Sequence, residues 1–269
     1  MDVIEEVRAH YGAAGLTDRL RTALGPADRP VHPADLASLD QFHTRGLAAT
    51  EELAELAGIS AGIAVLDVGC GIGGPARYLA ATYGCNVLGV DISEPFVDAA
   101  RYLTHRTGQT ESVWFEAGSA LELPVEDASF DVALLQHVAM NIADRASLYK
   151  EIARVLNSGG KFATFDVVSL SGDPIYPLPW ARNPSSSFLL SSDETCAAVE
   201  HAGFRLLKRQ DGTEAAKNWF AELQANGPLS PLNLGLIMGP DMRELASNLA
   251  RNVMEGRLGI LTALFELAS

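Results

Sequence analysis

Val65-Leu66-Asp67-Val68-Gly69-Cys70-Gly71-Ile72-Gly73-Gly74 is the stretch of sequence that decides the fold. It begins as an apolar, β-branched run, passes through a loop with four glycines and enters a stretch of helical length. Only glycine lets backbone N–H groups turn toward a ligand and approach it without a Cβ clash. Asp91 ends the next β-branched run, where a carboxylate can accept hydrogen bonds from both hydroxyls of a ribose. The stretch therefore predicts a strand, a ligand-binding loop and a helix.

Short β-branched runs alternate with amphipathic stretches from residue 63 onward. This alternation is typical of a doubly wound α/β sheet with helices on both faces. Strands are predicted at 64–68, 86–90, 112–115, 130–135, 161–165, 204–207 and 258–265. Helices are predicted at 74–82, 94–106, 145–156, 192–202, 214–225 and 240–255. The sequence thus predicts a sheet of about seven strands.

Two segments fall outside this alternation. Residues 1–60 predict helices broken at glycine and proline, and residues 170–190 are irregular and rich in Pro, Ser and aromatic residues. We therefore expect residues 1–60 to form a helical lid. Residues 61–269 are expected to form the main domain, with cap insertions near 170–190 and 214–255.

Composition narrows the expected partners. The 269 residues carry a formal net charge of −14, which disfavours nucleic acid and anionic membrane surfaces because neither offers a counter-charge. No apolar run reaches the roughly 18 residues that span a bilayer, so we expect a cytoplasmic protein without stable membrane anchoring. The three cysteines show no zinc-type spacing, which predicts free thiols and no metal site. A small molecule is the expected partner, and the oligomeric state stays open.

The glycine loop allows two interpretations. Gly69, Gly71 and Gly74 also match the G-x-G-x-x-G pattern of nicotinamide-dinucleotide proteins. The second interpretation is a loop that binds a ligand with a methionine moiety. Asp67 favours it, because a carboxylate at this position suits the ammonium group of such a ligand and repels a pyrophosphate. A nicotinamide-dependent oxidoreductase remains an alternative, as does a non-catalytic cofactor-binding scaffold, since a fold alone does not show turnover.

These motifs together strongly resemble the class I S-adenosylmethionine-dependent methyltransferases, especially the ubiquinone/menaquinone, sterol/tocopherol and glycine/sarcosine groups. The resemblance covers residues 41 to about 210 and, more weakly, the rest of the chain. It is carried by the glycine loop, Gln41-Phe42-His43-Thr44-Arg45-Gly46, Gly74-Pro75-Ala76-Arg77-Tyr78-Leu79-Ala80 and Arg154-Val155-Leu156-Asn157-Ser158-Gly159-Gly160. It implies the strand order 3-2-1-4-5-7-6 with the last strand antiparallel, S-adenosylmethionine as methyl donor and S-adenosylhomocysteine as product.

The resemblance also assigns residues to the cofactor. It implies that Asp67 binds the amino group, Asp91 the ribose hydroxyls and Ile92 the adenine. Ser119 stands where the family more often has an Asp that binds the adenine amino group, so backbone groups of the next two residues are expected to contribute more. The predicted cofactor residues are Asp67, Gly69, Cys70, Gly71, Asp91, Ile92, Ser119, Ala120, Leu121 and Gln136.

Methyl transfer from a sulfonium is an in-line displacement in which the protein chiefly aligns nucleophile, carbon and sulfur. A general base is needed only if the nucleophile arrives protonated. The candidate bases are His137, at the end of a predicted strand, and His43. Residues predicted to contact a small-molecule acceptor, because they lie in the covering segments, are Tyr11, Phe42, Tyr176 and Trp180. The identity of the acceptor and of the methylated atom stays open.

Overall fold

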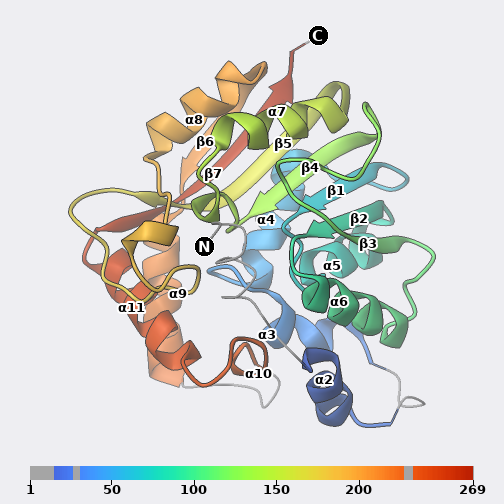
Figure 1. The fold of residues 1–269 in the computed structure, drawn as a ribbon, viewed down its shortest axis with the longest axis horizontal. Helices are drawn as coiled ribbons and strands as arrows, with labels where there is room; N and C mark the ends of the chain where they lie inside the picture. Colours follow the sequence, from blue (N-terminus) through green and yellow to red (C-terminus); the bar gives the residue numbers. More distant parts are fainter. Residues whose placement is uncertain (1–14, 27–30, 227–232, 269) are drawn as a thin grey trace.

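A computed structural model describes residues 15–26, 31–226 and 233–268. Within this part of the chain, one sheet has seven strands in the order β3-β2-β1-β4-β5-β7-β6 (Figure 1). The parallel pairs join β1 to β2 and β4, β2 to β3 and β4 to β5, whereas β7 is antiparallel to β5 and β6. The strands are β1 (Ala64–Val68), β2 (Asn86–Asp91), β3 (Val113–Ala117), β4 (Phe130–Gln136), β5 (Leu156–Ser169), β6 (Phe204–Asp211) and β7 (Leu258–Leu267). The predicted sheet, its strand order and its antiparallel last strand are confirmed.

Helices cover both faces of the sheet because both faces of its strands are apolar. Along β1, Val65 belongs to one buried cluster and Leu66 and Val68 to the other, as the two-residue period of a strand requires. The cluster of Leu66 packs under α7 (Arg145–Val155) and α8 (Ser192–His201). The cluster of Val65 packs under α4 (Leu47–Ala57), α5 (Gly74–Tyr83), α6 (Glu94–Arg106), α9 (Thr213–Asn226) and α11 (Met242–Met254).

The N-terminal segment packs beside the sheet rather than in it. It contains α2 (Leu16–Leu24), a 3₁₀-helix (Pro33–Leu36) and α3 (Ala37–Asp40). Glycines bound α2 as the sequence predicts, since Gly15 and Gly25 have φ values of 69° and 71°. A third apolar cluster joins Leu20 and Leu39 of this segment to Phe96 of α6 and Ile237 of α10 (Gly235–Met238). The N-terminal segment and α10 therefore lie side by side (Figure 1).

β5 is longer than the sequence predicts. Its pairing with β7 runs from Lys161 to Ser169. This antiparallel partner is about 100 residues away in sequence, so the local sequence pattern of β5 does not indicate how far the strand extends. The segment after β5 includes a 3₁₀-helix at Pro184–Ser186, and another 3₁₀-helix lies after β4 at Ala139–Asn141. No helix among the described residues is long and apolar enough to cross a membrane.

Candidate functional site

A cavity of about 1380 Å³ opens at the carboxyl ends of β2 and β4. Its wall combines the glycine loop and strand ends, residues 37–47 of the N-terminal segment, and side chains of α9, α10 and α11. Pockets for a single drug-sized ligand occupy about 300–1,000 Å³. The cavity is therefore large enough for two ligands that meet inside it.

The glycine loop forms one end of the cavity. Gly69 has φ 76°, and a Cβ there would lie 2.3 Å from Val138 Cγ2. Gly71 has φ 54°, and its N–H donates to Asp91 Oδ2 at 2.9 Å. The second oxygen of Asp91 accepts the N–H of Ser93 at 2.9 Å. Glycine is thus required at position 69 by both conformation and space and at position 71 by conformation, and the loop holds Asp91 at the cavity wall.

Two carboxyl groups near this loop are buried. Burial raises the pKa of Asp91 to about 6, although the hydrogen bonds that it accepts from backbone N–H groups act to lower this pKa. Burial, followed by the negative charge of Asp91, raises the pKa of Asp67 to about 7. Asp67 Oδ2 has no hydrogen-bond partner, and the side chain lies behind the cavity wall rather than on it. Unlike most of the residues predicted to bind the cofactor, Asp67 is therefore not a lining residue of this cavity. A cationic ligand group would act on it through a bridging water, and its charge would stabilise the ionised carboxylates.

His43 lies in the wall of the cavity and is 4% exposed. Its Nε2 is 2.9 Å from the carbonyl oxygen of Gly46 and 3.1 Å from Thr50 Oγ1. Burial lowers the pKa of His43 to about 4, so the ring is neutral at pH 7. Through Nε2, His43 orders the turn that brings segment 41–46 to the strand ends.

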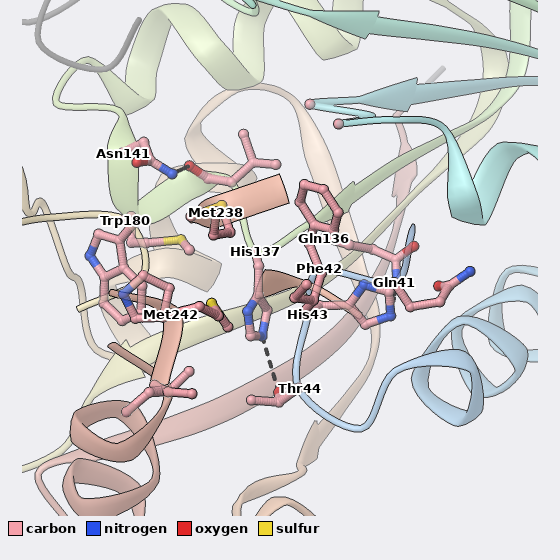
Figure 2. Close-up of a pocket in the computed structure, with 18 of the residues that line it drawn as sticks. Gln41, Phe42, His43, Thr44, Gln136, His137, Asn141, Trp180, Met238 and Met242 are labelled. Carbon is pink, nitrogen blue, oxygen red and sulfur yellow. Dashed lines mark hydrogen bonds between the residues drawn. The ribbon is translucent and has the colours of Figure 1, made fainter. Parts of the chain in front are cut away.

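His137 lies at the end of β4 with φ 54° and lines the cavity (Figure 2). Its ring stacks on Phe165 at a centroid distance of 5.4 Å, and its Nε2 lies 3.2 Å from Thr44 Oγ1. Burial, followed by the charge of His43, lowers the pKa of His137 well below its ordinary value. The neighbouring Gln136 also lines the cavity, and its buried Oε1 has no hydrogen-bond partner. A neutral imidazole and a free amide oxygen thus lie together at this strand end.

The structure brings most of the predicted site residues to one cavity. The predicted residues that line it are His43, His137, Gly69, Gly71, Asp91, Ile92, Ser119, Ala120, Leu121, Gln136, Phe42 and Trp180. Cys70 does not line it, because the residue packs against Gly89, where a Cβ would lie 2.8 Å from Cys70 Sγ. Tyr11 lies outside the described residues.

Tyr176 also lies away from the cavity wall. Its ring packs against the buried cluster of the sheet and α11. Asparagines of α11 fix the backbone on both sides of it: Ile175 N donates to Asn252 Oδ1 at 2.8 Å, and Asn248 Nδ2 donates to the Pro177 carbonyl at 3.0 Å. Trp180, in contrast, is held at the cavity by donation from Nε1 to Ser187 Oγ at 3.0 Å.

Sequence reasoning missed the apolar wall formed by the C-terminal helices. Met238 and Met242 face the cavity together with Trp180 (Figure 2), and Met140 lines it from the turn after β4. Three of the five methionines of the chain therefore line this one cavity. Methionine is flexible and polarisable, and its enrichment at ligand surfaces was the signal available in the sequence.

Comparisons with known proteins agree with this geometry. A family model described as a methyltransferase domain matches residues 66–164. Methyltransferase GfsG of Streptomyces halstedii is 34% identical over 192 residues, which cover 68% of this chain and 67% of that protein. The chain belongs to the class I S-adenosylmethionine-dependent methyltransferases.

Further relatives extend the comparison. A 24-methylenesterol C-methyltransferase of Oryza sativa subsp. japonica is 31% identical over 65% of this chain, but the match covers only half of that protein. The crystal structure of geranyl diphosphate C-methyltransferase from Streptomyces coelicolor A3(2) superposes with a TM-score of 0.71 at 19% identity. It covers 99% of this chain and 98% of that chain, and the low identity limits this likeness to the fold.

The residues of this methyltransferase fit S-adenosylmethionine. The partnerless Asp67 Oδ2 suits the methionine ammonium group, and Asp91 retains acceptor capacity for ribose hydroxyls. This fit and the family decide against the nicotinamide interpretation of the glycine loop. The backbone N–H of Leu121 is one of the groups predicted to contact the adenine. It already donates to Ser119 Oγ at 3.1 Å within the protein.

Proposed function

We propose that this methyltransferase transfers a methyl group to a hydroxyl oxygen of a bulky, largely apolar and uncharged small molecule. The observation that carries the proposal is the imidazole of His137, which lines a cavity whose wall is predominantly apolar beside it. The apolar residues of that wall include Met140, Trp180, Trp219, Phe220, Leu223, Leu234, Met238, Met242 and Leu249.

The charges in the wall support an uncharged acceptor. Among the described lining residues, Arg45 and Arg243 are the cationic side chains, and Arg45 is already bound to Glu52 with Nη1 2.7 Å from Oε2. A diphosphate bound directly by protein side chains is normally held by several cationic groups. These facts disfavour a phosphorylated acceptor.

An amine acceptor has little support either. A cationic amine is best bound by a carboxylate, and the acidic residues of the described wall are Asp91 and Asp144. Asp91 belongs to the proposed ribose site, and Asp144 caps α7 by accepting the N–H of Ser147 at 2.9 Å. A hydroxyl, in contrast, must lose a proton during methylation, which gives a neutral histidine a role.

The proposal is tested by incubating the purified protein with S-adenosylmethionine and three size-matched panels: hydroxylated apolar compounds, amines and phosphorylated isoprenoids. We expect S-adenosylhomocysteine release and an O-methylated product only with the first panel. His137→Gln should lower turnover by about 100-fold or more and leave S-adenosylhomocysteine affinity unchanged. Methylation of nitrogen or carbon, or an active His137→Gln protein, contradicts the proposal.

A further inference from the structure

Thr44 and His137 are 93 positions apart in the sequence and meet in the wall of the cavity (Figure 2). Thr44 is 3% exposed, and its Oγ1 lies 3.2 Å from His137 Nε2. The backbone turn after it is left-handed, with φ 67° at Arg45 and 51° at Gly46. Because buried polar groups are nearly always hydrogen-bonded, this contact fixes one nitrogen of the imidazole.

The remaining freedom of the His137 ring is small. The His137 N–H donates to the Phe165 carbonyl at 2.9 Å, and the two rings stack with an interplanar angle of 6°. A left-handed backbone is strained for a non-glycine residue, and such residues cluster at active sites. An imidazole has two nitrogens, and Thr44 takes Nε2. Nδ1 is therefore the nitrogen left for an acceptor.

We propose that Thr44 is a positioning residue whose hydroxyl oxygen accepts the Nε2–H of His137 and so keeps the Nδ1 lone pair available to the acceptor hydroxyl. This inference rests on the proposed function. A neutral imidazole carries one proton, so the two tautomers have opposite consequences. If Thr44 instead donated to Nε2, the proton would reside on Nδ1 and His137 could not act as a base there.

The proton and charge balance follows from this arrangement. The donor supplies the methyl group: its carbon–sulfur bond breaks with the electron pair left on sulfur, while the acceptor oxygen bonds to the carbon. The hydroxyl proton passes to His137 Nδ1, which leaves an imidazolium with both nitrogens protonated. The positive charge lost at sulfur reappears on His137, so the cavity keeps the same net charge. The Nε2–H bond to Thr44 then strengthens, because its donor becomes charged.

The tautomer can be measured without an acceptor. Protein labelled with ¹⁵N-histidine and saturated with S-adenosylhomocysteine gives long-range ¹H–¹⁵N spectra that distinguish Nδ1–H from Nε2–H. The His137 signals are those missing from His137→Gln. We expect the Nε2–H tautomer in the wild type and in Thr44→Ser, and a substantial Nδ1–H population in Thr44→Val. An Nδ1–H tautomer in the wild type overturns the proposal, and so does an unchanged tautomer in folded Thr44→Val.

A second measurement uses whichever hydroxylated compound the acceptor screen identifies. Thr44→Val should lower kcat about tenfold or more with S-adenosylhomocysteine affinity unchanged, and Thr44→Ser should restore most of it. If His137→Gln turns over normally, the proposed function fails. If His137→Gln is inactive but Thr44→Val is as active as the wild type, only the role of Thr44 fails. If Thr44→Val does not fold, the wild-type tautomer still decides.

Discussion

Asp40 of α3 and Arg77 of α5 form an ion pair in which Arg77 Nη2 lies 2.8 Å from Asp40 Oδ2. Both side chains are buried, with exposed fractions of 4% for Asp40 and 1% for Arg77. The backbone of Asp40 also lies directly over Gly74, where a Cβ would be 2.2 Å from the Asp40 carbonyl oxygen. Arg77 is further bound to the Ala100 carbonyl at 3.3 Å. The N-terminal segment is thus anchored on the helix that begins at the glycine loop.

This anchor predicts a large stability effect. Asp40→Asn leaves the Arg77 guanidinium buried without its counter-charge, so the free energy of unfolding should fall by about 3 kcal/mol. Urea denaturation followed by circular dichroism measures the change. The matched control is Asp18→Asn, whose partner Arg21 is exposed, and it should change stability by no more than about 0.5 kcal/mol. Equal effects of the two substitutions contradict a role for the buried pair.

Asp67 predicts how stability depends on pH. Its folded pKa of about 7 lies above the ordinary value of 3.8, so the folded protein binds a proton that the unfolded chain releases. This contribution to stability is complete below about pH 4 and is lost as the pH rises through about 7. Without ligand, Asp67→Asn should therefore be about 2 kcal/mol more stable than the wild type at pH 8.

The same substitution separates stability from binding. Asp67→Asn removes the charge proposed for the methionine ammonium group, so it should weaken S-adenosylhomocysteine binding while it stabilises the free protein. Thermal unfolding at pH 5 and pH 8 and calorimetry at pH 8 measure both effects. A variant that binds as tightly as the wild type shows that the carboxylate has no such partner.

Asp91→Ala should weaken S-adenosylhomocysteine binding by about 2–3 kcal/mol, or roughly 30- to 150-fold, because charge-assisted hydrogen bonds to the ribose are lost. Isothermal calorimetry measures the affinity. Asp98→Ala, on the exposed face of α6, is the matched control and should bind normally. Unchanged affinity in Asp91→Ala removes the ribose assignment.

Ser119→Asp should tighten S-adenosylhomocysteine binding by about 1 kcal/mol, roughly fivefold. The ionised side chain can accept the Leu121 N–H that the serine now accepts, and it adds a second oxygen for the adenine amino group. Calorimetry on Ser119→Asp and on Ser119→Ala gives the comparison. Clearly weaker binding by a folded Ser119→Asp protein shows that the adenine approaches from elsewhere.

Trp180→Ala should lower turnover about tenfold or more and leave S-adenosylhomocysteine affinity within about twofold of the wild type. The reason is that Trp180 lines the cavity beside Met242 (Figure 2) and is not among the residues predicted to bind the cofactor. Trp114 is 47% exposed on the edge strand β3, and Trp114→Ala serves as the control. Normal turnover in Trp180→Ala would falsify its role in acceptor binding.

The sequence by itself determined the sheet and predicted most of the residues that meet at the glycine-loop end of the cavity. Strand periodicity, the glycine loop and the spacing to Asp91 are local patterns, and each is imposed by backbone geometry within about 30 residues. The resemblance added the strand order, which the structure confirms. The resemblance also singles out segment 41–46. The structure places this segment beside the glycine loop, since the ring of Phe42 lies 3.5 Å from a Cβ built on Gly71.

The tertiary structure alone decided the other end of the cavity, where we propose that the acceptor binds. The packing of Met238 and Met242 against the cavity, the pairing of Thr44 with His137 and the burial of Arg77 by Asp40 all join residues from distant segments. Such contacts depend on how helices dock, and no local period encodes docking. Tyr176 shows the same limit, because hydrogen bonds from α11 hold its neighbours and direct its ring to the core instead of the cavity.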